Sequence, residues 1–175
     1  MKNDYDYDYD YKDGWPADEV LLLEPGVDLR DVCLDQRDLS GRELEGASLS
    51  SVSLQEAQLL KANLREVDAY KTSLKKAYLA DADLSGARFE ESDLEGANLW
   101  DANLRGAVFV GTGLRRVNLE GADLRGAYLA DADLSGADLE GADLEGTILS
   151  PEMIAKFAKE LSAAKNLDKI VLEAQ

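Results

Sequence analysis

The sequence contains no histidine, one cysteine and three prolines among its 175 residues, and its aromatic residues are two tryptophans, seven tyrosines and three phenylalanines. Without histidine, a Ser-His-Asp triad and a metal site built on imidazole are both excluded. The lone Cys33 excludes an intrachain disulfide and fits a reducing compartment. The apolar run Val20–Leu23 is far too short to span a bilayer, and the acidic start of the chain has no apolar segment behind it. We therefore expect a cytoplasmic protein without a signal peptide.

Basic residues are also scarce, with 19 Lys and Arg against 36 Asp and Glu, a formal net charge of −17. Residues 1–26 carry −6 (8 acidic, 2 basic), residues 27–149 carry −11 (24 against 13), and residues 150–175 are neutral (4 against 4). A protein this acidic repels nucleic acids and anionic membranes and attracts basic surfaces. The composition therefore predicts no direct nucleic-acid or membrane binding, and a protein partner with a basic or mixed surface.

What the sequence has in abundance is a five-residue repeat. Between Leu119 and Gly146 each unit reads Ala, then Asp (once Tyr), then Leu, a polar residue and usually Gly. The Leu position, called the central position below, recurs every fifth residue from Leu29 to Leu149 without an insertion, and 22 of its 25 occurrences are Leu. The other three are Phe89, Phe109 and Ala69. Repeats held this long determine the architecture.

A period of five fits neither a helix, which needs apolar residues at a spacing of 3.6, nor a long strand, which needs alternation. The residue two before each central position is Ala 14 times, Val five times and Thr three times. The exceptions there are Ser92, Arg37 and Arg42. In an extended segment the small residue and the Leu point to one side, so the chain has to turn a corner before the next unit. Gly holds the second corner residue in 11 of the 24 corners from Asp31 to Gly146, where a type II turn needs a positive φ.

This motif, Ala-Asp/Asn-Leu followed by two variable residues, resembles the pentapeptide-repeat family. The units that match it most closely are Ala97-Asn98-Leu99, Ala102-Asn103-Leu104 and Ala122-Asp123-Leu124. The resemblance covers about residues 27–149. It implies an all-β solenoid, a right-handed quadrilateral β-helix with four pentapeptides per coil, and it does not imply one function.

Both ends of the repeat are expected to be covered, because a terminal coil otherwise exposes its core and unpaired backbone. We expect three regions: an acidic Tyr/Asp tail (1–17), the β-helix with an N-terminal cap strand (18–149) and a C-terminal α-helical cap (150–175). The tail, with four Asp-Tyr pairs, is interpreted as a loose segment or a sticky arm. The strand is expected at residues 19–26, with Glu19, Glu24 or a backbone carbonyl meeting the inward Arg37 and Arg42.

At the other end, Ser150-Pro151-Glu152 reads as a helix start, with Ser as the N-cap and Pro at the first helical position. The apolar residues that follow at helical spacing are Met153, Ile154, Phe157, Ala158 and Leu161. A second short helix is expected after Asn166, with Leu167, Ile170 and Val171 on one face. Such helices cover the last coil, and they offer a surface for a homodimer.

If a coil holds four units, residues four units apart lie in columns. Phe89 and Phe109 then stack inside the core, and the small side chain of Ala69 in the coil beneath compensates for the volume of the two rings. On the surface, Lys75, Glu95 and Arg115 form a ladder of alternating charge, and Lys76 and Arg116 flank it. Glu45 with Arg65 is a second opposite-charge pair, and Arg105 with Arg125 precedes Glu145. Cys33 is expected at an outward position of the first coil.

Two surface features are candidates for an interaction site. Leu60, Ala80 and Trp100 share one outward column with Tyr78 beside it, and Val108 and Val110 flank Phe109 on the neighbouring face. The region from Gly126 to Leu149 has six carboxylates and no base, which a regular rod would present as an array. These carboxylates are Asp131, Asp133, Asp138, Glu140, Asp143 and Glu145.

Catalysis needs groups that converge in a concave site. The repeat instead predicts a convex surface over a core filled with Leu and Ala, so we expect neither an enzyme nor a cofactor. One hypothesis is a rigid rod or scaffold that binds another protein. The alternative is an acidic DNA mimic that binds a DNA-handling enzyme, because the rod resembles the pentapeptide-repeat quinolone-resistance proteins, which bind DNA gyrase. Several of those carry loops inserted between coils, and this repeat has none. A third hypothesis is weak binding of divalent cations at carboxylate ladders such as Asp81 and Asp101.

Overall fold

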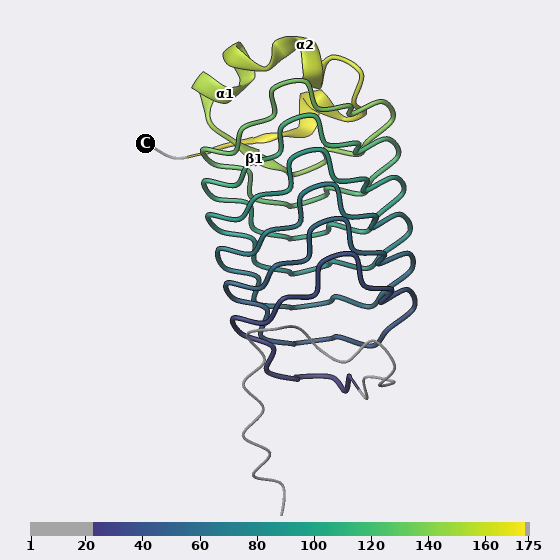
Figure 1. Ribbon diagram of the computed structural model, residues 1–175. Coiled ribbons are helices and arrows are strands. Elements are labelled where there is room, and N and C mark those ends of the chain that lie inside the picture. Colours follow the sequence, from purple (N-terminus) through teal and green to yellow (C-terminus); the bar gives the residue numbers. More distant parts are fainter. Residues whose placement is uncertain (1–22, 174–175) are drawn as a thin grey trace, which may run out of the picture.

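The computed structural model describes residues 23–173, whose chain winds into a stack of coils that runs from purple to green in Figure 1. The residue before each central position pairs in parallel with the equivalent residue four units later, from Asp28 with Ser48 to Tyr128 with Ile148. Each coil therefore holds four five-residue units, as the family resemblance implies. Four columns of central residues follow from this, and each column defines one lateral face of the rod.

Every corner from residue 31 to residue 146 has a positive φ at its second residue, whether or not that residue is Gly. The corner at Leu29 shows the type II pattern, because the Val32 N–H donates to the Leu29 carbonyl at 3.1 Å and φ is +62° at Asp31. Thirteen of the 24 corners have a side chain at this position, for example Lys61 and Asp101. The left-handed conformation costs such residues about 1 kcal/mol. The backbone bonds between coils hold these corners in place.

The sides of the coils are too short to form long strands. Each side contributes one paired residue, so the ladders are chains of single bridges. Within the described range, the regular strands are β1 (Ile148–Leu149) and β2 (Val171–Leu172), which pair in parallel. The fold is therefore a solenoid whose coils are joined by one-residue β-bridges and not by long strands.

The core is a column of apolar side chains down the middle of the rod. Every central side chain from Leu29 to Leu149 is at most 2% exposed. The Phe89 and Phe109 rings stack with their centroids 5.3 Å apart and an interplanar angle of 10°, and Ala69 is fully buried in the coil beneath. This confirms the stacking predicted from the column.

A column of buried hydroxyl groups lines one side of this core. Thr72, Ser92 and Thr112 follow one another at intervals of four units, at inward positions, and are at most 3% exposed. Each hydroxyl donates to the carbonyl of a central residue in the preceding coil, at 2.5, 2.5 and 2.6 Å respectively. Thr147 donates in the same way to the Leu124 carbonyl at 2.8 Å. The sequence pattern predicts only small residues at these positions, and it does not predict their hydrogen bonds.

The N-terminal end differs from the prediction in one respect. Of the strand expected at residues 19–26, only residues 23–26 are described, and Glu24-Pro25-Gly26 forms a corner in which the Val27 N–H donates to the Glu24 carbonyl at 3.1 Å. Pro at the second and Gly at the third turn position favour a type II turn, so the coil begins one unit earlier than predicted. Arg37 and Arg42 are half-buried, Glu24 is exposed, and Glu19 and the Tyr/Asp tail lie outside the described residues.

The C-terminal segment starts as predicted and then departs. Helix α1 (Pro151–Lys156) has Ser150 as its N-cap, and α2 (Ala158–Leu161) follows after a break at Phe157. Both lie over the end of the coil stack in Figure 1, and Met153, Phe157 and Leu161 are buried in the core cluster.

The second helix predicted after Asn166 is wrong. The chain forms only a three-residue 3-10 turn, η2 (Leu167–Lys169), and then returns as β2 alongside β1. Gly146 donates its N–H to the Lys169 carbonyl, and Val171 donates to the Thr147 carbonyl, at 3.0 and 2.9 Å. The last coil thus pairs its backbone with this returning segment, which supplies hydrogen-bond partners for its N–H and C=O groups.

Candidate interaction surface

The Asp and Asn residues of the motif have a structural task. In the unit 97–101, four of the five backbone N–H groups donate to backbone carbonyls, and the fifth, that of Trp100, donates to the Asn98 side chain at 3.0 Å. Thirteen units contain this Asx arrangement, in which Asp or Asn accepts the N–H two residues later. Many carboxylates of the acidic surface are therefore explained by the backbone they cap.

The carboxylates of the C-terminal coils also have more hydrogen-bond and ion-pair partners than the sequence indicates. Lys169 of the returning segment pairs with Glu145 at 3.4 Å, and Asp143 lies 3.8 Å from the Arg125 guanidinium. Asn166 donates to the Asp143 carboxylate at 2.7 Å. The region has no base of its own, but its neighbours supply two, and part of the predicted charge array is compensated.

These contacts lower the pKa values of several carboxyls. The hydrogen bond from Arg125 holds the pKa of Asp123 below its usual value, and the hydrogen bond from Asn166 does the same for Asp143. The Ser135 hydroxyl lowers the pKa of Asp133. At the other end of the rod, the hydrogen bond from Arg30 lowers the pKa of Asp28 to about 2. All four are therefore charged at neutral pH.

The nine candidate residues do not form one site. Leu60, Tyr78, Trp100, Asp138 and Glu140 lie on the face whose central residues are the column from Leu39 to Leu139 in steps of four units, called the tryptophan face below. The remaining four lie elsewhere. Asp131 is at a corner, Asp133 is on a second face, and Asp143 and Glu145 are on a third.

The apolar patch of the tryptophan face is smaller and more tightly packed than predicted. Trp100 and Tyr78 are 40% and 36% exposed and Leu60 is half-buried, but Ala80 is fully buried although it occupies an outward position. The prediction of an exposed Ala80 is wrong, because its small side chain is fully buried while Leu60 and Trp100, at the same position of the coils below and above, stay partly exposed. The exposed part of the patch is therefore Tyr78 and Trp100, with Leu60 half-buried beside them.

A second apolar stripe runs up the phenylalanine column's face. Val108, Tyr128 and Ile148 follow one another in bridging pairs, and Val171 of β2 continues the column at 48% exposure. The Tyr128 hydroxyl donates to the Glu173 carboxylate, and this hydrogen bond raises the pKa of Tyr128. The repeat predicts Val108 on this face but not the continuation, because β2 was expected to be a helix.

The charge ladders form, but on different partners from those predicted. Lys75 pairs with Asp93 at 2.9 Å, and Arg116 with Glu95 at 3.5 Å, in place of straight rungs from Lys75 through Glu95 to Arg115. The Glu45–Arg65 pair is present at 3.8 Å. Arg105 and Arg125 both contact Asp123, at 3.7 and 2.5 Å. Lys75 and Arg105 reach an Asp of the next coil, whereas Arg116 pairs with Glu95 of the preceding coil and Arg125 with Asp123 of its own unit.

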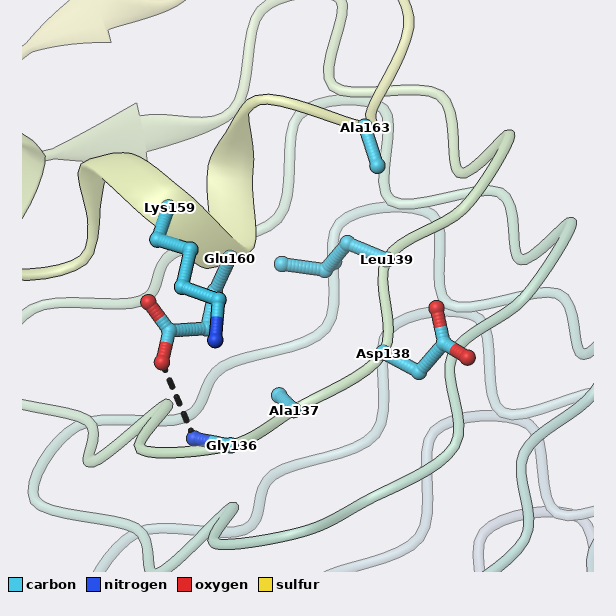
Figure 2. Close-up of a pocket in the computed structure, with 7 residues that line it drawn as sticks. All are labelled: Gly136, Ala137, Asp138, Leu139, Lys159, Glu160 and Ala163. Atoms are coloured by element: carbon cyan, nitrogen blue, oxygen red, sulfur yellow. Dashed lines mark hydrogen bonds between the residues drawn. The ribbon is translucent and has the colours of Figure 1, made fainter.

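Two hollows lie at the C-terminal end, at the junction of the helices and the coils. The larger, of about 230 Å³, is lined by Gly136, Ala137, Asp138, Leu139, Lys159, Glu160 and Ala163 (Figure 2). In it the Glu160 carboxylate accepts the Gly136 N–H at 3.0 Å, while Asp138 points away, so these two acidic side chains do not converge. The smaller, of about 200 Å³, lies beside α1 and includes Asp131 and Lys156.

Metal and membrane sites can be assessed within residues 23–173. There, no three His, Cys, Asp or Glu side chains gather into a group that could hold a metal ion, so the ladder at Asp81 and Asp101 lacks a third ligand. None of the helices in that range has the length and hydrophobicity needed to cross a bilayer. Cys33 is exposed on the first coil, as predicted.

Comparison with known proteins agrees with this geometry. The family model for pentapeptide repeats matches eight times, over residues 38–68, 72–111 and 114–150. No curated protein sequence matches the chain. Among solved structures, QnrB1, a plasmid-mediated fluoroquinolone resistance protein, has a TM-score of 0.55 at 20% identity, over 72% of this chain and 69% of its own. This likeness concerns the fold alone.

Two cyanobacterial proteins are more similar in sequence. Rfr23 from Cyanothece 51142 is 28% identical over 70% of this chain and 87% of its own, with a TM-score of 0.45. HetL from Nostoc sp. strain PCC 7120, a protein involved in heterocyst differentiation regulation, is 34% identical over 73% of this chain and 53% of its own, with a TM-score of 0.38. Both are described as pentapeptide repeat proteins.

Proposed function

Because the chain belongs to the pentapeptide-repeat family, we propose that it is a non-catalytic rod that binds another protein through one of its lateral faces. The observation that carries this is the filled interior: every central residue is at most 2% exposed, and most of the small inward residues two positions before them are buried as well. Catalysis needs convergent groups, and the acidic side chains of the larger hollow do not converge. We include in the proposal the right-handed, four-sided coil that the family resemblance implies and the C-terminal helical cap that the residues from Ser150 onward predict.

An affinity experiment tests this proposal. The full chain is immobilised at physiological salt and is expected to retain one partner protein in stoichiometric amount. Chemical cross-links between the two proteins should then fall on residues of one lateral face of the rod. The control is Leu104→Asp, which places an unpaired carboxylate in the fully buried middle of the core and prevents folding. Retention of the same proteins by the unfolded control, or of none by the folded chain, contradicts the proposal.

The homodimer expected from the sequence is kept in this proposal, but its contact surface differs from the C-terminal helices. The stripe of Met153, Phe157 and Leu161 is buried against its own core and is not free to pair two chains. The exposed apolar residues at this end are Val171 and Leu172 of β2, at 48% and 58% exposure. A dimer would therefore use the β2 edge. The cytoplasmic location expected from the sequence stays a prediction.

The alternative function is that the chain mimics DNA and binds a DNA-handling enzyme such as DNA gyrase. It is supported by the exposed carboxylates of Asp131, Asp138 and Glu140 in the last coils. It is weakened by the pairing of Glu145 and Asp143 with Lys169 and Arg125. Because a phosphate backbone is uniformly negative, a mimic with compensated charges binds a basic groove less well. We therefore rank the protein-binding rod first.

A further inference from the structure

We propose that the tryptophan face is the docking surface of the rod and that its occupant is a cationic segment of a partner protein carrying one large apolar side chain. This inference rests on the proposed function, to which it adds a surface and a class of partner. It joins two features that are separate in the sequence, the apolar patch and part of the acidic array.

The first step is the preformed apolar anchor. Ala80 is fully buried although it occupies an outward position, and Leu60 and Trp100 occupy the same position one coil below and one coil above it. The backbone beside Trp100 is fixed by its hydrogen bond to Asn98. Tyr78 bridges to Asn98, two residues before Trp100, so an exposed Tyr and an exposed Trp lie in adjacent coils of one face, and residues of these two types often dominate binding energy.

The second step is the charge that borders this anchor. Five carboxylates lie on the same face or its corner. They are Asp81, Asp101, Glu120, Asp138 and Glu140. Among the described residues none of the five takes part in an ion pair, in contrast to Asp123 and Asp143 on the adjoining face. Lys61 follows Leu60 at the corner one coil below Asp81, Lys159 lines the hollow that includes Asp138, and Lys165 lies beside Gly141.

The third step is the choice of occupant by charge. A second copy of this chain, with a net charge of −17, brings like charges to an acidic face. The N-terminal tail, at −6 over residues 1–26, is repelled for the same reason. A basic segment instead gains attraction over a Debye length of about 8 Å and places an apolar side chain against Trp100. Charge complementarity therefore favours a cationic partner.

A synthetic peptide tests the surface directly. The probe is a twelve-residue peptide of Lys, Arg and Ser with a single central Leu, labelled with a dye, and its control has Glu in place of the basic residues. The full chain carries Trp15→Phe, so that Trp100 is the remaining indole and its emission reports on the patch. We expect saturable binding of the basic peptide, a blue shift of Trp100 emission and no binding of the acidic peptide.

Matched variants locate the binding. Trp100→Ser is expected to weaken binding of the basic peptide about tenfold, the size typical of an anchor residue. The double variant Glu120→Gln/Glu140→Gln is expected to weaken it severalfold and to reduce its salt dependence. The control Glu66→Gln/Asp131→Asn removes the same charge from exposed corners away from this face and should change binding less than twofold.

Three outcomes overturn the inference: no saturable binding, binding that Trp100→Ser leaves unchanged, or equal losses in the two double variants. Equal losses would mean that the peptide follows net charge and not this face. In that case the protein-binding rod can still succeed in the affinity experiment through another face, so the two proposals fail separately.

Discussion

At the scale of single residues, the motif is explained by hydrogen bonds as much as by burial. The Asp or Asn before each central Leu caps an outward N–H that the coil ladder leaves unused, as Asn98 does for Trp100. The small inward residue is replaced by Thr or Ser where a hydroxyl can reach a carbonyl of the coil below, as in Thr112. Acidity and a polar core position therefore have local structural causes before any function is considered.

Replacing Thr112 by Val tests the buried hydroxyl column. The change keeps the shape and removes the hydrogen bond to the Phe89 carbonyl, so the free energy of unfolding should fall by about 0.5–1.5 kcal/mol. Thr112→Ser keeps the hydroxyl and is the control for that bond. Urea denaturation of the three proteins measures the difference, and an unchanged stability for Thr112→Val would show that the hydroxyl contributes nothing.

Acid should destabilise the rod through its capped carboxyls. The folded pKa values of Asp28, Asp123, Asp133 and Asp143 are lowered, so the unfolded chain binds more protons as the pH falls. The stability they add is present above the unfolded Asp value of about 3.9 and is lost as the pH falls towards 2. Thermal unfolding between pH 7 and pH 2 should show a plateau and then a decline.

The variant Asp143→Asn separates charge from capping in this experiment. An amide oxygen can still accept the Glu145 N–H, so the turn is kept while the titrating group is lost. We expect the acid decline to become shallower. Because the charged carboxylate adds its stability above about pH 4, the variant should also be less stable on the plateau, and an unchanged plateau or a steeper decline would contradict the assignment.

At the scale of elements, the C-terminal segment is the part of the chain that does not repeat. Helices α1 and α2 place Met153, Phe157 and Leu161 on the core, and β2 then adds a parallel rung beside β1. Together they cover the apolar side chains and pair the carbonyl and N–H groups of the last coil, the two needs of a solenoid end.

Truncating Phe157 tests this covering. The ring is 3% exposed, so Phe157→Ala should lower the free energy of unfolding by about 3–5 kcal/mol. Lys159→Ala, at an exposed position of α2, is the control and should change it by less than about 0.5 kcal/mol. Similar values for the two variants in chemical denaturation would mean that the helices do not pack on the core.

The sequence predicts the repeating part well because each position has many other examples along the chain. The corner at Asp31, the inward Leu104 and the stacked Phe89 and Phe109 all follow from one period, and the structure confirms them. The prediction fails for the C-terminal segment, which occurs only once in the chain. Leu167–Val171 has helical spacing, but its backbone instead bonds to carbonyls of the last coil, and such long-range bonds leave no local signal.

The candidate surface was predictable only in part. Stepping by four units places Leu60 and Trp100 in one column, and the same step would have placed Glu120 and Glu140 there. The burial of Ala80 and the diagonal Lys75–Asp93 pair depend on side-chain conformations that a column count does not contain. The grouping of charges by primary sequence also missed Lys169, which reaches Glu145 from the returning segment.

At the scale of the whole molecule, the rod presents four faces of different character. The tryptophan face combines apolar side chains with carboxylates that, among the described residues, have no ion-pair partner, whereas the face carrying Asp123 and Asp143 has ladders of paired charge. The negative charge is therefore distributed unequally among the faces, and this difference supports the ranking of the protein-binding rod above DNA mimicry.

A DNA gyrase supercoiling assay tests the alternative function at this scale. We expect no inhibition by the chain at any ratio, because its last coils are partly compensated by Arg125 and Lys169. The companion variant carries neutral amides at Asp131, Asp133, Asp138, Glu140 and Asp143. Inhibition by the natural chain that disappears in this variant would support DNA mimicry over the protein-binding rod.

Every face of the rod depends on residues four units apart being stacked neighbours, and the tryptophan face exists only if the coils keep that step. The chain offers a direct test, because Cys33 is exposed and bridges to Ser53 in the next coil. In Ser53→Cys the two thiols lie one rung apart, roughly 4.8 Å along the rod. In Ser48→Cys the new thiol is three units away from Cys33, on another face.

The measurement is intramolecular cross-linking of the purified monomer by a bifunctional thiol reagent of one-rung length, read by mass spectrometry. We predict rapid bridging of Cys33 in Ser53→Cys and none in Ser48→Cys, and heat-unfolded samples should show no preference. Bridging in Ser48→Cys, or equal bridging in both folded variants, would contradict the four-unit coil and every face assigned from it.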